Sequence, residues 1–381
     1  GAVIFVVARQ GDGNQVLAQA PLNIETQIKP AFIMAVDDSG SMTFHNQLPA
    51  ADGYGCWSRN SSSSSWGFFN GTVPRIATTS GGSCSYSYSY TGPRIGDSYF
   101  GIPPMDSYGF ARSPDFNPAY FDPTITYQPW LNSDGTPYGS SAGNPLGNAD
   151  IAATRIDPRA ASTIALAGSL ADENSRSRFQ AYTGMFFPQG TEYRLTGSSN
   201  CGGLTGGGTW RTVGPGGVTL SSSCATYIKY WPATFFLKSD SIVAADGSAQ
   251  PGYGAITPVE ITNACGTGCS LWKYTIKATD TVALQNFANW YSFYGNRNRA
   301  MVAGMTRSMA DINSMRVGYF TINSASGDVT MRDMAVPADR GSLYTSMLAL
   351  PASGGTPNLT AVNHIGRQFQ RTDSGAPVAL S

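Results

Sequence analysis

Ala31-Phe32-Ile33-Met34-Ala35-Val36-Asp37-Asp38-Ser39-Gly40-Ser41 is the stretch that decides the fold. Six apolar residues, 31–36, run without a break into a turn that is rich in Asp, Ser and Gly. Such a short apolar run is typical of a strand that is buried on both faces, as in a parallel sheet. The sequence therefore predicts a buried strand over 31–36, with polar side chains at the edge where open α/β sheets bind ligands.

Regular patterns return after residue 280. Apolar side chains follow helical spacing from Leu284 to Ile312, with Gly295 as a point where the helix kinks or breaks. Strands are expected over 315–322 and 328–336, a short helix over 342–350, and a last helix over 359–369. This succession predicts an α/β fold in which helices cover a mainly parallel sheet.

The long segment between these parts, 46–279, has a different composition. Pro, Gly, Ser and aromatic residues dominate it, and helical periodicity is poor. Alternation of Ser with Tyr86, Tyr88 and Tyr90 would place the three tyrosines on one face of a strand. Two interpretations stay open for them: a row packed against its own domain, or an exposed aromatic surface for glycans or partners.

All six cysteines lie in this segment and fall into three close couples: Cys56 with Cys84, Cys201 with Cys224, and Cys265 with Cys269. An even number of cysteines in local pairs predicts disulfides formed in an oxidising compartment. A zinc site is the alternative, but the chain has no CxxC pair and its only histidines are His45 and His364. The cysteines therefore indicate an extracytoplasmic protein.

Charge is low and balanced, with 24 Lys+Arg against 24 Asp+Glu among 381 residues. The absence of a basic run argues against a nucleic-acid partner. The apolar run over 2–8 is far shorter than the roughly 20 residues that span a bilayer. We expect neither a nucleic-acid partner nor a membrane span.

Asp37, Ser39 and Ser41 place a carboxylate and two hydroxyls at alternate positions of one turn. Such oxygen ligands suit Mg²⁺, Ca²⁺ or Mn²⁺. The loop Gly354-Gly355-Thr356 offers another hydroxyl beside glycines that allow close backbone approach. An ordinary capped turn at the start of a helix is the alternative for 37–41. The order of the two loops, with a buried strand before the first and helices around the second, favours a metal site.

These loops resemble the metal-ion-dependent adhesion site (MIDAS) of von Willebrand factor A domains, where a buried strand ends in Asp-x-Ser-x-Ser and a Gly-Gly-Thr loop follows. The wider sequence resembles the PilY/PilC family of type IV pilus tip proteins. The segments that carry this second resemblance are 37–42 (DDSGSM), 116–123 (FNPAYFDP), 127–130 (YQPW), 230–235 (YWPATF) and 285–294 (QNFANWYSFY).

The resemblance implies a von Willebrand factor A-like, Rossmann-type core formed by residues 30–45 and 280–381. An N-terminal lead-in, 1–29, would precede the core, and the irregular or β-rich disulfide-containing insertion, 46–279, would interrupt it. We expect the rest of the sheet and a C-terminal propeller of the same chain to follow Ser381, so that the core is incomplete at its C-terminus.

The resemblance also implies a divalent cation, Mg²⁺ or Ca²⁺ with Mn²⁺ as a further candidate, at Asp37, Ser39, Ser41 and Thr356. A further carboxylate from a Thr-Asp-Gly segment is expected after Ser381. We therefore expect partial or no occupancy of the site by this chain alone.

The function implied by the resemblance is that of an adhesin and pilus biogenesis factor at the tip of a bacterial type IV pilus. Minor pilins, the pilus tip and a host-cell or abiotic surface would be its partners, and the pilus tip, cell surface or periplasm of a Gram-negative bacterium its location. A structural or force-responsive cap with a vestigial metal site is the alternative.

A secreted hydrolase is a third and weaker hypothesis, and we do not expect an enzyme. Ser39 lacks the Gly-x-Ser-x-Gly elbow of a nucleophile, and the only histidine bases are His45 and His364. The loop at Thr356 has no Lys and is not a phosphate loop.

Overall fold

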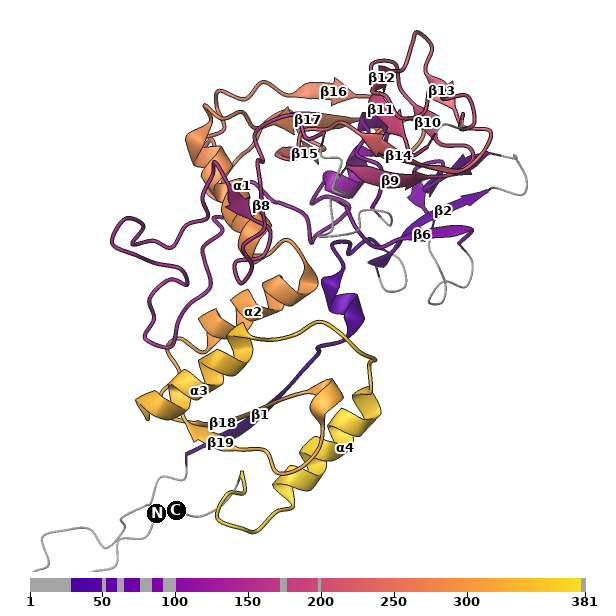
Figure 1. Ribbon diagram of the computed structural model, residues 1–381. Coiled ribbons are helices and arrows are strands. Elements are labelled where there is room, and N and C mark those ends of the chain that lie inside the picture. The colour runs from indigo at the N-terminus through magenta and orange to yellow at the C-terminus, as the bar shows by residue number, and fades with distance from the viewer. Residues whose placement is uncertain are drawn as a thin grey trace, which may run out of the picture.

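The computed structural model describes residues 29–49, 53–59, 65–75, 84–91, 101–171, 177–197 and 200–377. The expected lead-in, apart from Lys29, lies outside the described residues. The described chain has a lower part built around one small sheet and an upper part built from many short strands (Figure 1). The helices are α1 (Thr281–Phe293), α2 (Arg297–Ser308), α3 (Pro337–Leu348) and α4 (Asn358–Phe369), with 3₁₀ helices η1 (Gly40–Thr43), η3 (Asp106–Arg112) and η4 (Ile322–Ser324).

The lower sheet has the strand order β1-β18-β19. Its strands are β1 (Ala31–Val36), β18 (Arg316–Thr321) and β19 (Met331–Asp333). β1 runs parallel to β18 over six residue pairs, and β19 runs antiparallel to β18. The strand predicted over 31–36 is confirmed, but it lies at an edge of the sheet and Phe32 is 47% exposed, so it is less buried than predicted.

Two cores cover the two faces of this sheet. On one face Val36 packs with Val317 of β18 and with Leu343 of α3. On the other face Ile33 and Phe320 pack with Ala361 of α4. Figure 1 shows α3 and α4 on either side of the three strands. Because successive side chains of a strand point to opposite faces, an unbroken apolar run is what two covering helices require.

The upper part contains six further small sheets in the described residues. Their strands are β2 (Gly55–Arg59), β3 (Trp66–Gly67) and β6 (Tyr86–Tyr88); β4 (Phe69–Asn70) with β5 (Val73–Pro74); β7 (Thr154–Arg155) with β8 (Thr163–Ile164); β9 (Arg178–Ala181), β11 (Glu192–Leu195), β12 (Arg211–Thr212) and β14 (Cys224–Ile228); β10 (Phe186–Phe187) with β13 (Val218–Thr219); β15 (Thr234–Leu237), β16 (Val259–Ile261) and β17 (Leu271–Thr275).

The prediction of a mainly parallel, von Willebrand factor A-like sheet of the Rossmann type is wrong. β1 with β18 is the only parallel strand pair among the described residues, and every other strand pairing there is antiparallel. The α/β pattern of the sequence covers only its two ends. Most strands form in the middle of the chain, where segments of two to five residues pair antiparallel.

Three disulfides lie in this upper part, which confirms the expectation of disulfide bonds. They join Cys56 to Cys84, Cys201 to Cys224, and Cys265 to Cys269. The tyrosine row packs inside its own domain: Tyr88 and Tyr90 are buried, and the ring of Tyr86 stacks on that of Tyr182. These three tyrosines therefore do not form an exposed surface.

Candidate metal centre

The turn after β1 holds three of the four predicted metal ligands. The backbone N of Ser39 donates to Oδ1 of Asp37 at 2.8 Å, and Oγ of Ser39 lies 3.0 Å from Oγ of Ser41. Ser39 occupies the N-cap position of η1, yet its side chain makes no capping hydrogen bond. The hydroxyl is thus not used for the ordinary capped turn that was the alternative interpretation of this motif.

The loop 353–356 lies against this turn. The backbone N of Ser353 donates to O of Asp38 at 2.6 Å, and the backbone N of Gly40 donates to O of Gly354 at 3.1 Å. Gly354 has a φ of 98°, and a Cβ there would lie 2.9 Å from Oδ1 of Asn323. A glycine is therefore required for the loop to reach the turn.

Thr356 is the fourth predicted ligand. It is exposed, and its carbonyl O accepts from the backbone N of Asn358, the first residue of α4. The loop that carries Thr356 is therefore held to the turn at Ser353 and Gly354. Among the described residues, the side chain of Thr356 forms no hydrogen bond with Asp37, Ser39 or Ser41.

Asp38 and Asn323 join the two loops and were not predicted. Asp38 is 4% exposed, and its Oδ1 accepts from the backbone N of Asn323 at 3.1 Å and from Nδ2 of Asn323 at 2.8 Å. The same Nδ2 donates to O of Gly355 at 2.9 Å. Asp38 lies within the sequence motif 31–41 and could have been considered. No pattern in the sequence around Asn323 indicates that Asn323 joins the two loops.

The electrostatic environment at the end of β1 is negative. Burial, reinforced by the negative charge of Asp38, raises the pKa of Tyr319 to about 12. The phenol therefore stays neutral at physiological pH and adds no charge beside Asp37 and Asp38. A cation is the ion that such an environment favours.

The donor chemistry fits a hard divalent cation. Asp37, Ser39 and Ser41 present only oxygen ligands, which Mg²⁺ and Ca²⁺ prefer, but fewer than the six or more such ions take. Within the described ranges no group of three or more His, Cys, Asp or Glu side chains could hold a metal ion. A site here would therefore depend on hydroxyl oxygens, with water or a partner filling the remaining positions.

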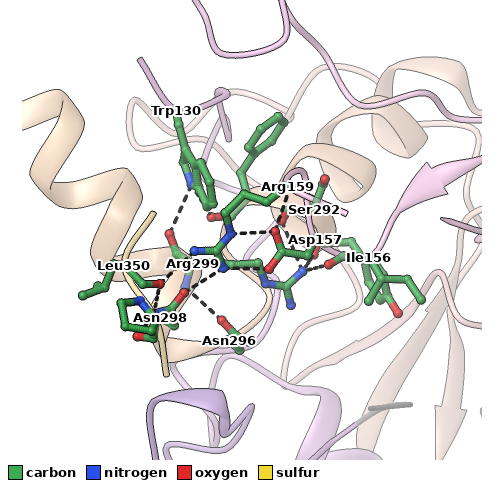
Figure 2. A network of polar contacts seen from close by, with 12 residues as sticks. Trp130, Ile156, Asp157, Arg159, Ser292, Asn296, Asn298, Arg299 and Leu350 are labelled. Carbon is green, nitrogen blue, oxygen red and sulfur yellow. Dashed lines mark hydrogen bonds and ion pairs between the residues drawn. The ribbon is translucent and has the colours of Figure 1, made fainter. Parts of the chain in front are cut away.

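A polar network holds residues 350–351, which lead into the 353–356 loop (Figure 2). Nη1 of Arg159, from the insertion, donates to O of Leu350 at 2.9 Å, and its Nη2 donates to Oδ1 of Asn298 at 2.9 Å. Nδ2 of Asn298 donates to O of Leu350 at 3.1 Å and to O of Pro351 at 2.9 Å. The insertion thus contacts the chain at Leu350, four residues before Gly354.

Asp157 orients Arg159 in this network. Its two carboxylate oxygens accept from Nε of Arg159 at 2.9 Å and from Nη2 at 2.7 Å. Burial alone would raise the pKa of Asp157, but the hydrogen bonds and charge of Arg159 lower it overall. Such a two-point pair holds a guanidinium in a fixed plane.

The segment 285–294, which carries part of the family resemblance, attaches α1 to the insertion. Oδ1 of Asn289 accepts from the backbone N of Ala149 at 2.9 Å, and its Nδ2 donates to O of Tyr127 at 3.0 Å. Oδ1 of Asn286 accepts from the backbone N of Tyr127 at 2.8 Å, and its Nδ2 donates to O of Ile125 at 2.8 Å. These amides bind the insertion backbone, so the motif has a structural use.

The histidines considered as bases lie apart in the fold. His364, on α4, is buried, with its ring edge-on to Phe320 and its Nε2 3.4 Å from Nε2 of Gln368. His45 lies edge-on to the ring of Tyr90, where the chain enters the insertion.

No helix in the described part of the chain has the length and apolar character needed to cross a bilayer.

Neither protein-family models, nor curated proteins, nor solved structures give a match to this chain.

Proposed function

We propose that this chain is the surface-binding part of an extracytoplasmic adhesin that acts at the tip of a bacterial type IV pilus and in pilus biogenesis. Binding would depend on a divalent cation at Asp37, Ser39, Ser41 and Thr356. The observation that carries this proposal is the attachment of the 353–356 loop to the 37–41 turn, through Ser353 N to Asp38 O and Gly40 N to Gly354 O.

Two further observations support the setting. The three disulfides fit a protein of an oxidising compartment outside the cytoplasm. The segments 116–123 and 285–294 resemble those of PilY/PilC pilus tip proteins, and this resemblance is the support for the pilus and for minor pilins as partners.

The residues of the turn determine what the site could bind. Asp37 supplies one carboxylate and the serines supply neutral hydroxyls, so a bound divalent cation would keep positive charge and free coordination positions. An acidic side chain of a surface partner is the ligand that fits such a position. Asn323, Ser353 and Gly354 hold the two loops together and so keep the hydroxyls in place.

Calorimetric titration of the chain with Mg²⁺, Ca²⁺ and Mn²⁺ tests the cation. Asp37→Asn keeps the size of the side chain but removes its charge, and we expect it to weaken binding at least tenfold. A matched control is available in Ser239 and Ser241, whose hydroxyls lie 3.1 Å apart on an exposed loop. The control with both serines changed to Ala should bind the cation as the parent does.

Binding of the cation by Asp37→Asn as tightly as by the parent would show that the site is misassigned. If the parent binds no cation and bacteria carrying Asp37→Asn still assemble pili and attach, the proposal fails in favour of a structural cap with a vestigial site.

A further inference from the structure

Two buried arginines, Arg112 and Arg299, line one internal cavity. Arg112 is the last residue of η3 and is 6% exposed; Arg299 lies in the first turn of α2 and is 4% exposed. Neither forms an ion pair with a carboxylate in the part of the chain that the structure describes. A buried charge without a partner costs several kcal/mol, about as much as a small domain can spare.

Each guanidinium has an N–H that is not satisfied. Nη2 of Arg112 and Nε of Arg299 are buried without a hydrogen-bond partner among the described residues. The guanidinium of Arg112 lies over the face of the Tyr230 ring, 4.8 Å from its centroid. Nη1 of Arg299 donates to the carbonyl oxygens of Ile156, of Tyr291 at 2.8 Å and of Ser292 at 3.2 Å. These carbonyl groups are dipoles and carry no net charge.

The carboxylate of Asp157 does not balance the charge of Arg299. Asp157 acts on Arg299 through its charge, but its two oxygens are hydrogen-bonded by the side chain of Arg159. One carboxylate therefore faces two guanidinium groups, those of Arg159 and Arg299. Burial lowers the pKa of Arg299 to about 10, which still leaves the side chain protonated at neutral pH.

The helix at this point adds to the positive potential. The first turn of α2 contains two arginines, Arg297 and Arg299, and no acidic residue. The macrodipole of a helix disfavours positive charge at the N-terminus, by about 0.3–1 kcal/mol for each charge. The carbonyl groups at the end of α1 that accept from Arg299 offset part of this charge, but no carboxylate among the described residues pairs with it, and an anion would complete the compensation.

The size of the cavity limits the ligand. Its volume is about 40 Å³. About 10–15 Å³ of such space holds one water molecule, so this cavity has room for a few waters or one small ion. Water alone could accept the free N–H groups but would leave the charges uncompensated. An organic acid would not fit.

We propose that this cavity binds a small inorganic anion such as chloride, which accepts hydrogen bonds from Nη2 of Arg112 and Nε of Arg299. The anion would lie where η3 of the insertion meets α1 and the first turn of α2, with Thr91 and Trp290 in the cavity wall. It would stabilise this junction, and the inference stands independently of the proposed cation site.

Thermal unfolding in sodium gluconate, with stepwise replacement by chloride or bromide at constant ionic strength, tests the anion. Gluconate is too large for the cavity. We expect the Tm to rise and saturate, by about 2 °C or more, as for a ligand that binds only the folded state. Arg112→Met should abolish this rise, and in gluconate its Tm should not fall below that of the parent. The control Arg211→Met, at an exposed position on β12, should keep the rise.

Anomalous diffraction from crystals grown in bromide tests the site in the unaltered chain, so the result does not depend on the folding of a variant. A bromide peak within hydrogen-bond distance of both arginines is expected. Only water in the cavity, or the same shift of Tm in the parent, Arg112→Met and Arg211→Met, would overturn the proposal.

Discussion

Asn323 donates two hydrogen bonds to one oxygen of the buried Asp38 carboxylate, from its backbone N at 3.1 Å and from Nδ2 at 2.8 Å. Asp38 follows β1, whereas Asn323 lies in η4 after the parallel neighbour β18. Nδ2 of Asn323 also donates to O of Gly355. One amide side chain therefore joins three segments that are far apart in sequence.

Asn323→Ala should lower the free energy of unfolding by about 2 kcal/mol or more, because a buried carboxylate loses a charge-assisted donor. Urea denaturation measures this effect. The same change should weaken cation binding, since the 353–356 loop loses the link through Asn323 and keeps only its two backbone hydrogen bonds to the turn. Asn363→Ala is the control, because Asn363 is exposed on α4 and its replacement should alter stability by less than about 0.5 kcal/mol. Equal effects of the two changes would contradict this role.

Local patterns explain which elements could be predicted. The run over 31–36 is β1, whose Ile33 and Val36 pack on the two covered faces of the sheet. The predicted break near Gly295 is confirmed, since α1 ends at Phe293 and α2 begins at Arg297 after its cap Asn296. The last helix, predicted over 359–369, is α4. These signals depend on neighbours in sequence, so no knowledge of the tertiary fold was needed.

The role of Arg159, in contrast, could be recognised only from the folded structure. Arg159→Lys should destabilise the protein by about 2 kcal/mol, because an ammonium cannot serve Asp157, Leu350 O and Asn298 together as the guanidinium fork does. Combined with Asn298→Ala, its effect should be clearly less than additive. Arg367→Lys, at an exposed position on α4, is the control. Full additivity in urea denaturation would mean that the two residues act separately.

The antiparallel sheets of the insertion illustrate why the fold class was predicted wrongly. Ala181 of β9 pairs with Cys224 of β14, more than forty positions later. Strands this short carry little periodicity of their own, and their partners are chosen by packing at long range. The site divides in the same way: Asp37, Ser39 and Ser41 form a local motif, whereas Asn323 and Arg159 contribute through contacts that only the folded chain makes.

His364 should make stability depend on pH. Burial, together with the positive charge of Arg367, lowers its pKa below the ordinary value of 6.5, although Asp328 opposes this. The unfolded chain then takes up the proton first, so this contribution to stability is complete above about pH 6.5 and is lost as the pH falls through that value toward the folded pKa. His364→Gln should reduce the fall of Tm between about pH 7.5 and about pH 5. An unchanged fall would exclude His364 as a source.

The disulfides should differ in their contribution to stability. Cys56–Cys84 and Cys201–Cys224 span 28 and 23 positions, whereas Cys265–Cys269 spans 4. By chain entropy, each longer loop contributes about 3.5 kcal/mol and the short one about 2 kcal/mol. Replacement of each pair by serines, followed by urea denaturation, measures the order. A larger loss from the short loop than from either long loop would contradict the entropic account.

The insertion should carry the surface that selects a host ligand, since it begins beside the candidate cation site. Oγ1 of Thr43 lies 3.0 Å from the hydroxyl of Tyr90, and the backbone N of His45 donates to O of Ser89 at 3.1 Å. A partner bound at the turn would therefore also meet the insertion. Tyr88 and Tyr90 are buried, so contacts would come from other side chains, such as the 40% exposed Phe186.

Exchange of residues 46–279 for those of a relative with a different host preference tests this expectation, with cell attachment as the measurement. Attachment should follow the insertion, because rigid aromatic and adaptable polar side chains, in which this segment is rich, suit selective contacts. The donor insertion must keep acceptors for Asn286 and Asn289, which otherwise lose their backbone partners and destabilise the junction. The reciprocal exchange of 30–45 with 280–381 is the control. Attachment that follows these residues and ignores the insertion would mean that the insertion only covers the remainder of the chain.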